Sequence, residues 1–231
     1  MHPLDNPAWH ALAGPHRALG ETLPGAARYQ PDVTPFAALP DAPTEDDWRA
    51  LATLVGPRGL VVLFRPAEVQ APDGWRETFR APTVQMVGGG ARSAPSARAV
   101  RLGDADVDDM LALVAATKPG PFLRRTIELG TYLGIRGGGA LLAMAGERMR
   151  PPGYTEISAV CTADAARGRG LATELVCALV EQIQARGETP FLHAAADNHD
   201  AIRLYAALGF TLRASFDVVA LRPPREAPAV S

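Results

Sequence analysis

The chain has 231 residues, of which 47% are hydrophobic and 21% charged, so it is long enough and apolar enough to build a sizeable core. Its formal net charge is −2, and no run of lysine or arginine stands out. This argues against a dedicated nucleic-acid-binding protein, because phosphate neutralisation needs clustered cations. Two cysteines, Cys161 and Cys177, cannot form a disulfide framework and have no further ligand at zinc-site spacing, so no metal site is expected.

The N-terminal part gives few signals. Its first 21 residues contain no continuous apolar stretch, so we expect neither a signal peptide nor a membrane span, and a cytoplasmic location by default. Residues 22–43 hold five prolines and predict an extended coil. Thr44 is a candidate helix N-cap before three acidic residues, and residues 60–64 and 83–87 are short apolar runs that predict strands. Together these pieces predict a small α/β lobe over residues 1–87.

Residues 88–97 are small and flexible, and they predict a linker to a second domain over residues 98–231. That domain begins with strands and continues as strand, helix, strand, helix, strand. We expect helices over 104–117, from Leu171 to a stop at Gly187, and over 199–208, and strands over 99–102, 131–136, 140–145, 154–162, 191–196 and 212–221. This order predicts an α/β fold with a mixed, mostly antiparallel sheet flanked by helices.

A glycine-rich turn, Arg167–Gly170, leads directly into the helix that begins near Leu171. The first N–H groups of a helix have no intrahelical partner and lie at the positive end of its dipole, which suits a phosphate or pyrophosphate. Gly168 and Gly170 lack Cβ atoms, so an anion can approach the backbone closely. The alternative to a phosphate-binding turn is an ordinary helix start with two glycines that only make the backbone turn easier. No Gly-Lys-Ser/Thr follows, as a Walker loop requires, and residue 173 is Thr where a dinucleotide-binding turn needs a third glycine.

Two segments carry a family resemblance. Arg167-Gly168-Arg169-Gly170-Leu171-Ala172 resembles the Gln/Arg-x-x-Gly-x-Gly/Ala loop of the GCN5-related N-acetyltransferases, the GNAT superfamily. Asn198–Phe210 resembles the family's segment Asn-x-x-Ala-aliphatic-x-Leu-Tyr-x-x-Leu-Gly-Phe. The resemblance covers roughly residues 98–221, and Ser158–Thr162 is closest to the branch that includes glycine N-acyltransferases. The N-terminal lobe has no clear match, although a decayed second copy is one interpretation.

The resemblance implies acetyl-CoA as cosubstrate, with its pantetheine arm in a gap between the strands 154–162 and 191–196. It also implies a set of cofactor-binding residues: Cys161 and Thr162 at the thioester end, Arg167, Gly168, Arg169, Gly170, Leu171 and Ala172 at the pyrophosphate, and Asn198. Tyr205 matches the tyrosine that is often proposed to protonate the leaving thiolate. Phe122, Arg124 and Arg125 lie where the family places its variable acceptor-facing helix.

Glu156 is the candidate base that deprotonates the amine, with a water chain as the alternative. The competing interpretations are a solvent-facing strand carboxylate for Glu156 and a core residue for Tyr205. For His193 we expect a hydrogen-bonded core histidine and not a catalyst. We therefore expect an enzyme that transfers an acetyl or short acyl group from CoA to a primary amine by direct attack in a ternary complex.

Two other functions stay open. One is a non-catalytic acyl-CoA-binding sensor, and the other is a protein whose N-terminal lobe recruits the partner to be acetylated. The expected partner is a small-molecule or peptide amine, without nucleic acid or membrane, and a homodimer stays open.

Overall fold

The computed structural model describes residues 2–66 and 68–225. Its main feature is one eight-stranded sheet with the strand order β4-β11-β5-β10-β9-β8-β7-β6. The strands are β4 (Val61–Arg65), β5 (Arg76–Val87), β6 (Val100–Arg101), β7 (Tyr132–Gly137), β8 (Ala140–Glu147), β9 (Tyr154–Thr162), β10 (Thr189–Ala195) and β11 (Thr211–Arg222). Every neighbouring pair is antiparallel except β9 and β10, which are parallel. The expected mixed, mostly antiparallel sheet is confirmed.

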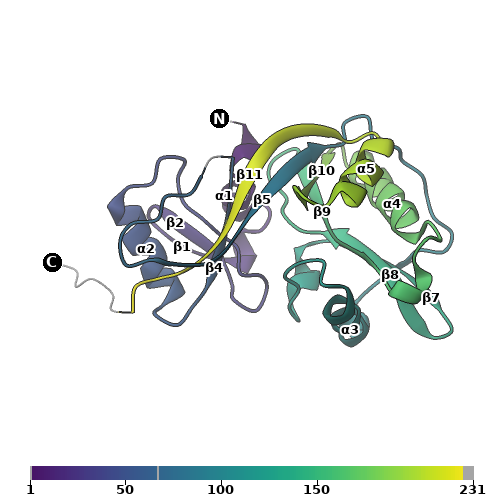
Figure 1. Cartoon of the computed structure of the whole chain (residues 1–231), viewed down its shortest axis with the longest axis horizontal. Coiled ribbons are helices and arrows are strands. Elements are labelled where there is room, and N and C mark those ends of the chain that lie inside the picture. The colour runs from purple at the N-terminus through teal and green to yellow at the C-terminus, as the bar shows by residue number, and fades with distance from the viewer. Residues whose placement is uncertain (1, 67, 226–231) are drawn as a thin grey trace.

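Helices cover both faces of the sheet. The residues of β7 and β8 alternate between two core clusters, because successive side chains of a strand point to opposite faces. Leu133 and Ala143 pack with α4 (Leu171–Ala185), whereas Tyr132 and Met144 pack with α3 (Val107–Thr117). The short helix α5 (His199–Ala207) contributes to the same cluster as α4 and lies beside it (Figure 1).

The remaining elements form an N-terminal lobe, which we define as residues 2–60; it is shorter than the range 1–87 expected from the sequence, because β4 and β5 belong to the eight-stranded sheet. It contains α1 (Pro7–Ala13), α2 (Glu45–Val55) and a three-stranded antiparallel sheet of β1 (Gly20–Leu23), β2 (Ala26–Tyr29) and β3 (Ala37–Ala38). Short 3₁₀ turns lie at Pro3–Asp5 and Arg17–Leu19 here, and at Asp104–Asp106, Thr126–Leu129 and Asp164–Ala166 further along the chain. As the sequence predicts, Thr44 caps α2, accepting a hydrogen bond from the Asp47 N–H at 3.3 Å. The expectation of an extended coil over residues 22–43 is wrong, because β2 and β3 pair within it.

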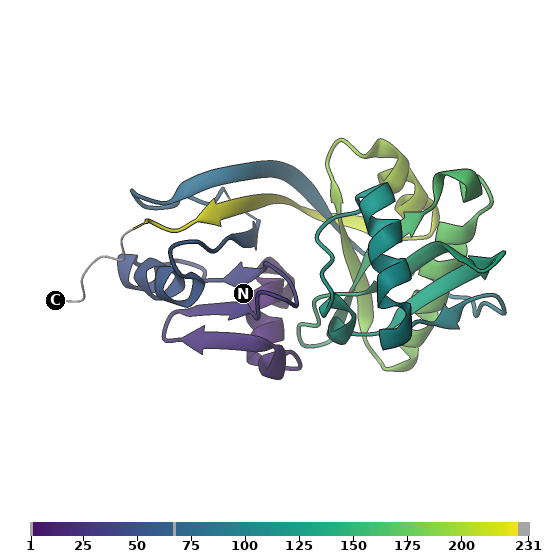
Figure 2. The ribbon, with the colours of Figure 1, turned by 90° about the horizontal axis from the view of Figure 1, so that it is seen from below.

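The sheet crosses the boundary that the sequence suggested at residues 88–97. β5 precedes that segment, yet it lies between β10 and β11 in the eight-stranded sheet. Val87 pairs with both Phe191 of β10 and Thr211 of β11. β5 and β11 run from the half of the molecule that holds α2 to the half that holds α4, and they bridge the two halves when seen from below (Figures 1 and 2). The glycine-rich segment 88–97 therefore connects two parts of one sheet and not two separate sheets.

No helix among the described residues is both long and apolar enough to cross a bilayer.

Candidate functional site

The site begins where β9 and β10 separate. The two strands pair only from Tyr154 to Glu156 on β9 and from Thr189 to Phe191 on β10. Beyond this point β9 carries Ala159 with φ of 52°, a conformation that a β-strand does not normally contain, and its register with β8 shifts nearby. The expected gap between residues 154–162 and 191–196 is therefore present.

A cavity of about 710 Å³ occupies this gap. Its lining includes residues of both strands from Ile157 to Thr162 and from His193 to Ala195, together with the start of α4, α5 and the end of α3. Most of the expected cofactor-binding residues lie on its wall, namely Cys161, Thr162, Arg167, Gly168, Gly170, Leu171, Ala172 and Asn198. Arg169 belongs to the same turn but does not line the cavity.

The turn before α4 is built to expose backbone N–H groups. Gly168 and Gly170 have φ of 74° and 73°, the left-handed region that glycine adopts without strain. Gly170 is the N-cap of α4, and no side chain of the described residues caps this end. The N–H groups of residues 168–172 find no acceptor among the residues that the structure describes. A Cβ at Gly168 or Gly170 would meet no atom within 4 Å, so the space over the turn is open. These features suit a pyrophosphate.

Two other lining residues have additional structural roles. The Asn198 Oδ1 accepts a hydrogen bond from the Ala201 N–H at 3.1 Å and so caps α5. Cys161 is 7% exposed, and burial raises the pKa of its thiol. A protonated, buried thiol is a poor nucleophile.

Tyr205 lines the cavity from α5 and is 8% exposed. Its ring packs edge-on against Phe210 with the centroids 6.0 Å apart. Thr34 Oγ1 is the one described side-chain polar atom that is fully buried without a partner. The Tyr205 hydroxyl also has no hydrogen-bond partner among the described residues, but it is not among the fully buried atoms, so the cavity wall does not enclose it completely. Burial raises the pKa of Tyr205 to about 12, which keeps the phenol protonated at neutral pH.

Glu156 occupies a different environment from the one expected. Its side chain is completely buried, and Glu156 is absent from the described lining of the cavity. The Arg148 guanidinium donates two hydrogen bonds to its carboxylate, at 2.8 and 2.5 Å. Burial alone would raise the pKa of Glu156, but the charge and hydrogen bonds of Arg148 outweigh it and lower the pKa to about 2. Such a carboxylate has little tendency to take a proton at neutral pH. The alternative of a solvent-facing carboxylate is wrong, because the side chain is completely buried.

His193 lies between Glu156 and Gln85, and its tautomer follows from the contacts of Gln85. The Gln85 Oε1 accepts from Arg213 at 2.8 Å, and its Nε2 donates to the Leu4 carbonyl at 2.9 Å, which fixes the orientation of the amide. The amide nitrogen therefore also donates to His193 Nε2, at 3.1 Å, and His193 Nδ1–H donates to Glu156 at 2.6 Å. Burial lowers the pKa of His193, so the imidazole is neutral, and the expectation of a hydrogen-bonded core histidine is confirmed.

Sequence reasoning missed Arg148, which lines the cavity. Its guanidinium carbon lies 4.9 Å from the centre of the Phe36 ring and 5.2 Å from that of Phe64. Both aromatic residues come from the first 87 residues, and Arg148 itself follows a strand without any motif. Nothing local in the sequence links these three positions.

Among residues 2–66 and 68–225, no group of three or more His, Cys, Asp or Glu side chains could hold a metal ion.

Comparisons with known proteins bear on the fold and the family. The FR47-like family model matches residues 132–218. A crystal structure of a protein assigned to the GNAT family of acetyltransferases, from Novosphingobium aromaticivorans DSM 12444, is 40% identical over 96% of this chain and 99% of its own, with a TM-score of 0.89. A GCN5-related N-acetyltransferase from Kribbella flavida shares the fold at 18% identity, with a TM-score of 0.64 and 94% of each chain covered. No curated protein sequence matches the chain. The likeness to the Novosphingobium protein over nearly the whole of both chains shows that this chain belongs to the GNAT family.

Proposed function

We propose that the protein is an N-acetyltransferase that moves an acetyl or short acyl group from CoA to a primary amine by direct attack in a ternary complex. The observation that carries the proposal is the cavity between β9 and β10, which has unpaired backbone N–H groups at one end and a protonated tyrosine in its wall. When bound, acetyl-CoA supplies the activated acyl group as a thioester.

The chain's own residues fit the two ends of this cosubstrate. The N–H groups of residues 168–172, with the nearby positive charge of Arg167, would hold the pyrophosphate. Cys161 and Thr162 would lie beside the pantetheine, in the opening of the sheet next to the bulge at Ala159. The Tyr205 phenol, which its raised pKa keeps protonated at neutral pH, would donate its proton to the departing sulfur.

The base is assigned differently from the expectation. Glu156 is ion-paired to Arg148 and accepts a hydrogen bond from His193. The unprotonated nitrogen of His193, Nε2, already accepts a hydrogen bond from Gln85, so neither residue is free to take a proton from the amine. Among the described residues of the cavity wall, Asp200 is the single carboxylate, and it is exposed and paired with Arg203. We therefore assign deprotonation of the amine to water in the cavity, the alternative that the sequence left open.

Two finer points complete the proposal. The sequence Ser158–Thr162 supports a place in the branch that includes glycine N-acyltransferases. The acceptor is a small-molecule or peptide amine.

A non-catalytic acyl-CoA sensor is the second candidate, and the burial of Glu156 favours it, because the cavity then contains no carboxylate well placed to act as a base. A screen of primary amines with acetyl-CoA, read as release of free CoA thiol, separates the two. Thiol release that depends on the amine supports the enzyme. Tight acetyl-CoA binding without release, for every amine in the screen, supports the sensor.

A further inference from the structure

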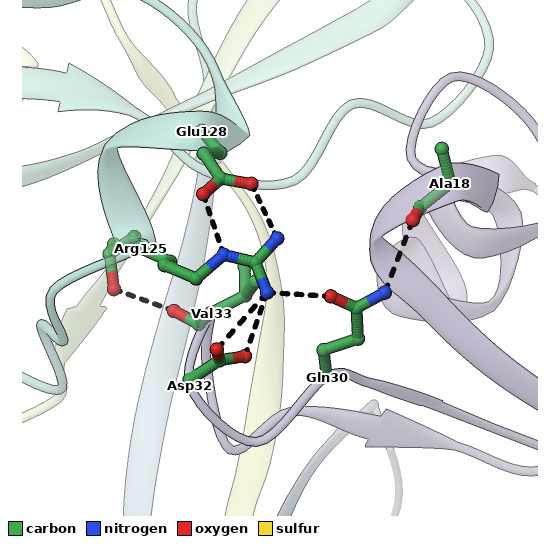
Figure 3. A network of polar contacts seen from close by, with 7 residues as sticks. Ala18, Gln30, Asp32, Val33, Arg125 and Glu128 are labelled. Atoms are coloured by element: carbon green, nitrogen blue, oxygen red, sulfur yellow. Dashed lines mark hydrogen bonds and ion pairs between the residues drawn. The ribbon is translucent and has the colours of Figure 1, made fainter.

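A polar hub at Arg125 fastens the N-terminal lobe to the rest of the molecule (Figure 3). Its Nη1 donates to the Gln30 amide oxygen at 2.8 Å and to both carboxylate oxygens of Asp32 at 3.0 and 3.1 Å. Its Nε and Nη2 donate to the two carboxylate oxygens of Glu128 at 2.6 and 2.7 Å. The guanidinium thus joins Asp32 of the lobe to Glu128, which lies three residues after Arg125. Its hydrogen bonds to Glu128 are bidentate, with one N–H donated to each carboxylate oxygen.

The neighbouring residue, Thr126, strengthens the same junction. Its hydroxyl donates to the Val33 carbonyl at 2.6 Å and accepts from the Leu123 N–H at 2.7 Å. Thr126 and Val33 are buried, so these bonds are shielded from water. The Arg125 N–H also donates to the Asp32 carbonyl at 3.3 Å. Gln30 is held in turn by its bond to the Ala18 carbonyl at 3.3 Å (Figure 3).

The segment that the hub holds continues into a wall of the cavity. α3 ends at Thr117, and residues Thr117, Lys118 and Pro119 line the cavity opposite the strands. Cys161 shares a core cluster with α3, and the Thr117 side chain lies within hydrogen-bond reach of its thiol, so this wall lies beside the C-terminal end of β9. Arg125 itself is absent from the described lining.

Residues 120–124 connect the wall to the hub, and several of them are restrained. Pro119 and Pro121 restrict the backbone, because the proline ring fixes φ. Phe122 is buried and packs edge-on against Tyr132, with the ring centroids 5.6 Å apart. The buried Phe122 ring thus links the segment at Arg125 to the wall, and Gly120, with φ of 135°, is the point between them where the backbone can still turn.

We infer that the N-terminal lobe supports this cavity wall, defined as residues 117–119, and that Arg125 is the positioning residue through which it does so. The inference rests on the proposed function only in taking the cavity as the reaction site. It gives the lobe a role within the chain: the lobe fixes the wall beside the C-terminal end of β9, although no described residue of the lobe lines the cavity.

The two cysteines allow a test that needs no acceptor. Cys161 lies under the wall, whereas Cys177 lies on α4 in a different core cluster, and both are free thiols. Labelling of each thiol with a maleimide, followed by peptide mass spectrometry, reports local opening at the two places separately. For Arg125→Ala we expect labelling of Cys161 to accelerate roughly tenfold, because several partly exposed charged hydrogen bonds are lost together. The labelling rate of Cys177 should stay unchanged.

Matched variants sharpen the test. Arg124→Ala removes a charge from the same segment, but its exposed ion pair with Asp108 lies outside the hub, so neither thiol should respond. Asp32→Ala should reproduce the effect of Arg125→Ala, and the double variant should add little, because both changes break the same junction. Arg125→Lys keeps the positive charge but loses the bidentate hydrogen bonds to Glu128, so we expect an intermediate rate of Cys161 labelling.

Two results would overturn the inference: equal acceleration of both thiols, which indicates a loss of global stability, or no response of Cys161 to Arg125→Ala. The proposed function is tested separately in the same assay, because bound CoA should slow labelling of Cys161 in the unaltered protein. Failure of CoA protection would count against the cosubstrate site and leave the comparison of variants intact.

Discussion

The Nδ1–H of His193 donates a hydrogen bond of 2.6 Å to the Glu156 carboxylate at the point where β10 leaves β9. Glu156 and Phe191 form the last pair of the β9–β10 ladder, and His193 lies two residues beyond Phe191 on β10. Arg148 completes the group on the other side of the carboxylate, against the rings of Phe36 and Phe64. The inner end of the cavity is therefore closed by a buried, charge-balanced group that joins β9, β10 and the first 87 residues.

Replacement of Glu156 should destabilise the fold. Glu156→Gln keeps the shape of the side chain but leaves the Arg148 guanidinium buried without its counter-charge. Removing one partner of a buried ion pair costs about 3 kcal/mol or more, so we expect the free energy of unfolding to fall by about that amount. Urea titration measures it. Asp108→Asn, which breaks an exposed pair with Arg124, should change the same quantity by less than about 1 kcal/mol. A Glu156→Gln protein as stable as the unaltered chain would contradict the structural role.

The same residue predicts a pH dependence. The folded pKa of Glu156 is about 2, below the ordinary value of 4.5, so the unfolded chain binds the proton more readily. The stabilisation from Glu156 is fully present above pH 4.5 and is lost as the pH falls from there towards 2. Urea unfolding at a series of pH values should show the gap in stability between the unaltered protein and Glu156→Gln narrowing over this window. A gap that is constant between pH 6 and pH 3 would contradict the lowered pKa.

Sequence predicted the local parts of the site and missed those that depend on distant contacts. The strand Tyr154–Thr162, the helix from Leu171 and the turn at Gly168 and Gly170 follow from hydrophobic period and glycine placement, which are local signals. The position of β5 depends on its pairing with β10 and β11, which lie far along the chain. The burial of Glu156 in an ion pair could not be predicted for the same reason, because neither a catalytic base nor a solvent-facing carboxylate implies it. A carboxylate on a strand predicts a solvent-facing side chain unless a buried cation compensates it, and no local pattern reveals Arg148.

Tyr205→Phe separates a chemical role from a packing role. The change removes only the hydroxyl and keeps the ring against Phe210. General acid catalysis typically contributes 10²–10⁴-fold, so we expect kcat to fall by roughly that factor with little change in acetyl-CoA affinity. Steady-state kinetics with an amine found in the acceptor screen measures both. Unchanged kcat with a lower melting temperature would assign Tyr205 to the core alone.

The most direct test of the account is calorimetric titration of acetyl-CoA into three proteins that differ only at residue 170. Gly170→Asp places a negative charge in the open space above the turn, where we propose that the pyrophosphate binds. Gly170→Asn is the matched control, because Asn has nearly the same size, carries no charge and tolerates the left-handed conformation that φ of 73° requires. We expect binding to be abolished in Gly170→Asp and weakened far less in Gly170→Asn. Equal affinity for acetyl-CoA in Gly170→Asp and the unaltered protein would contradict the proposed site.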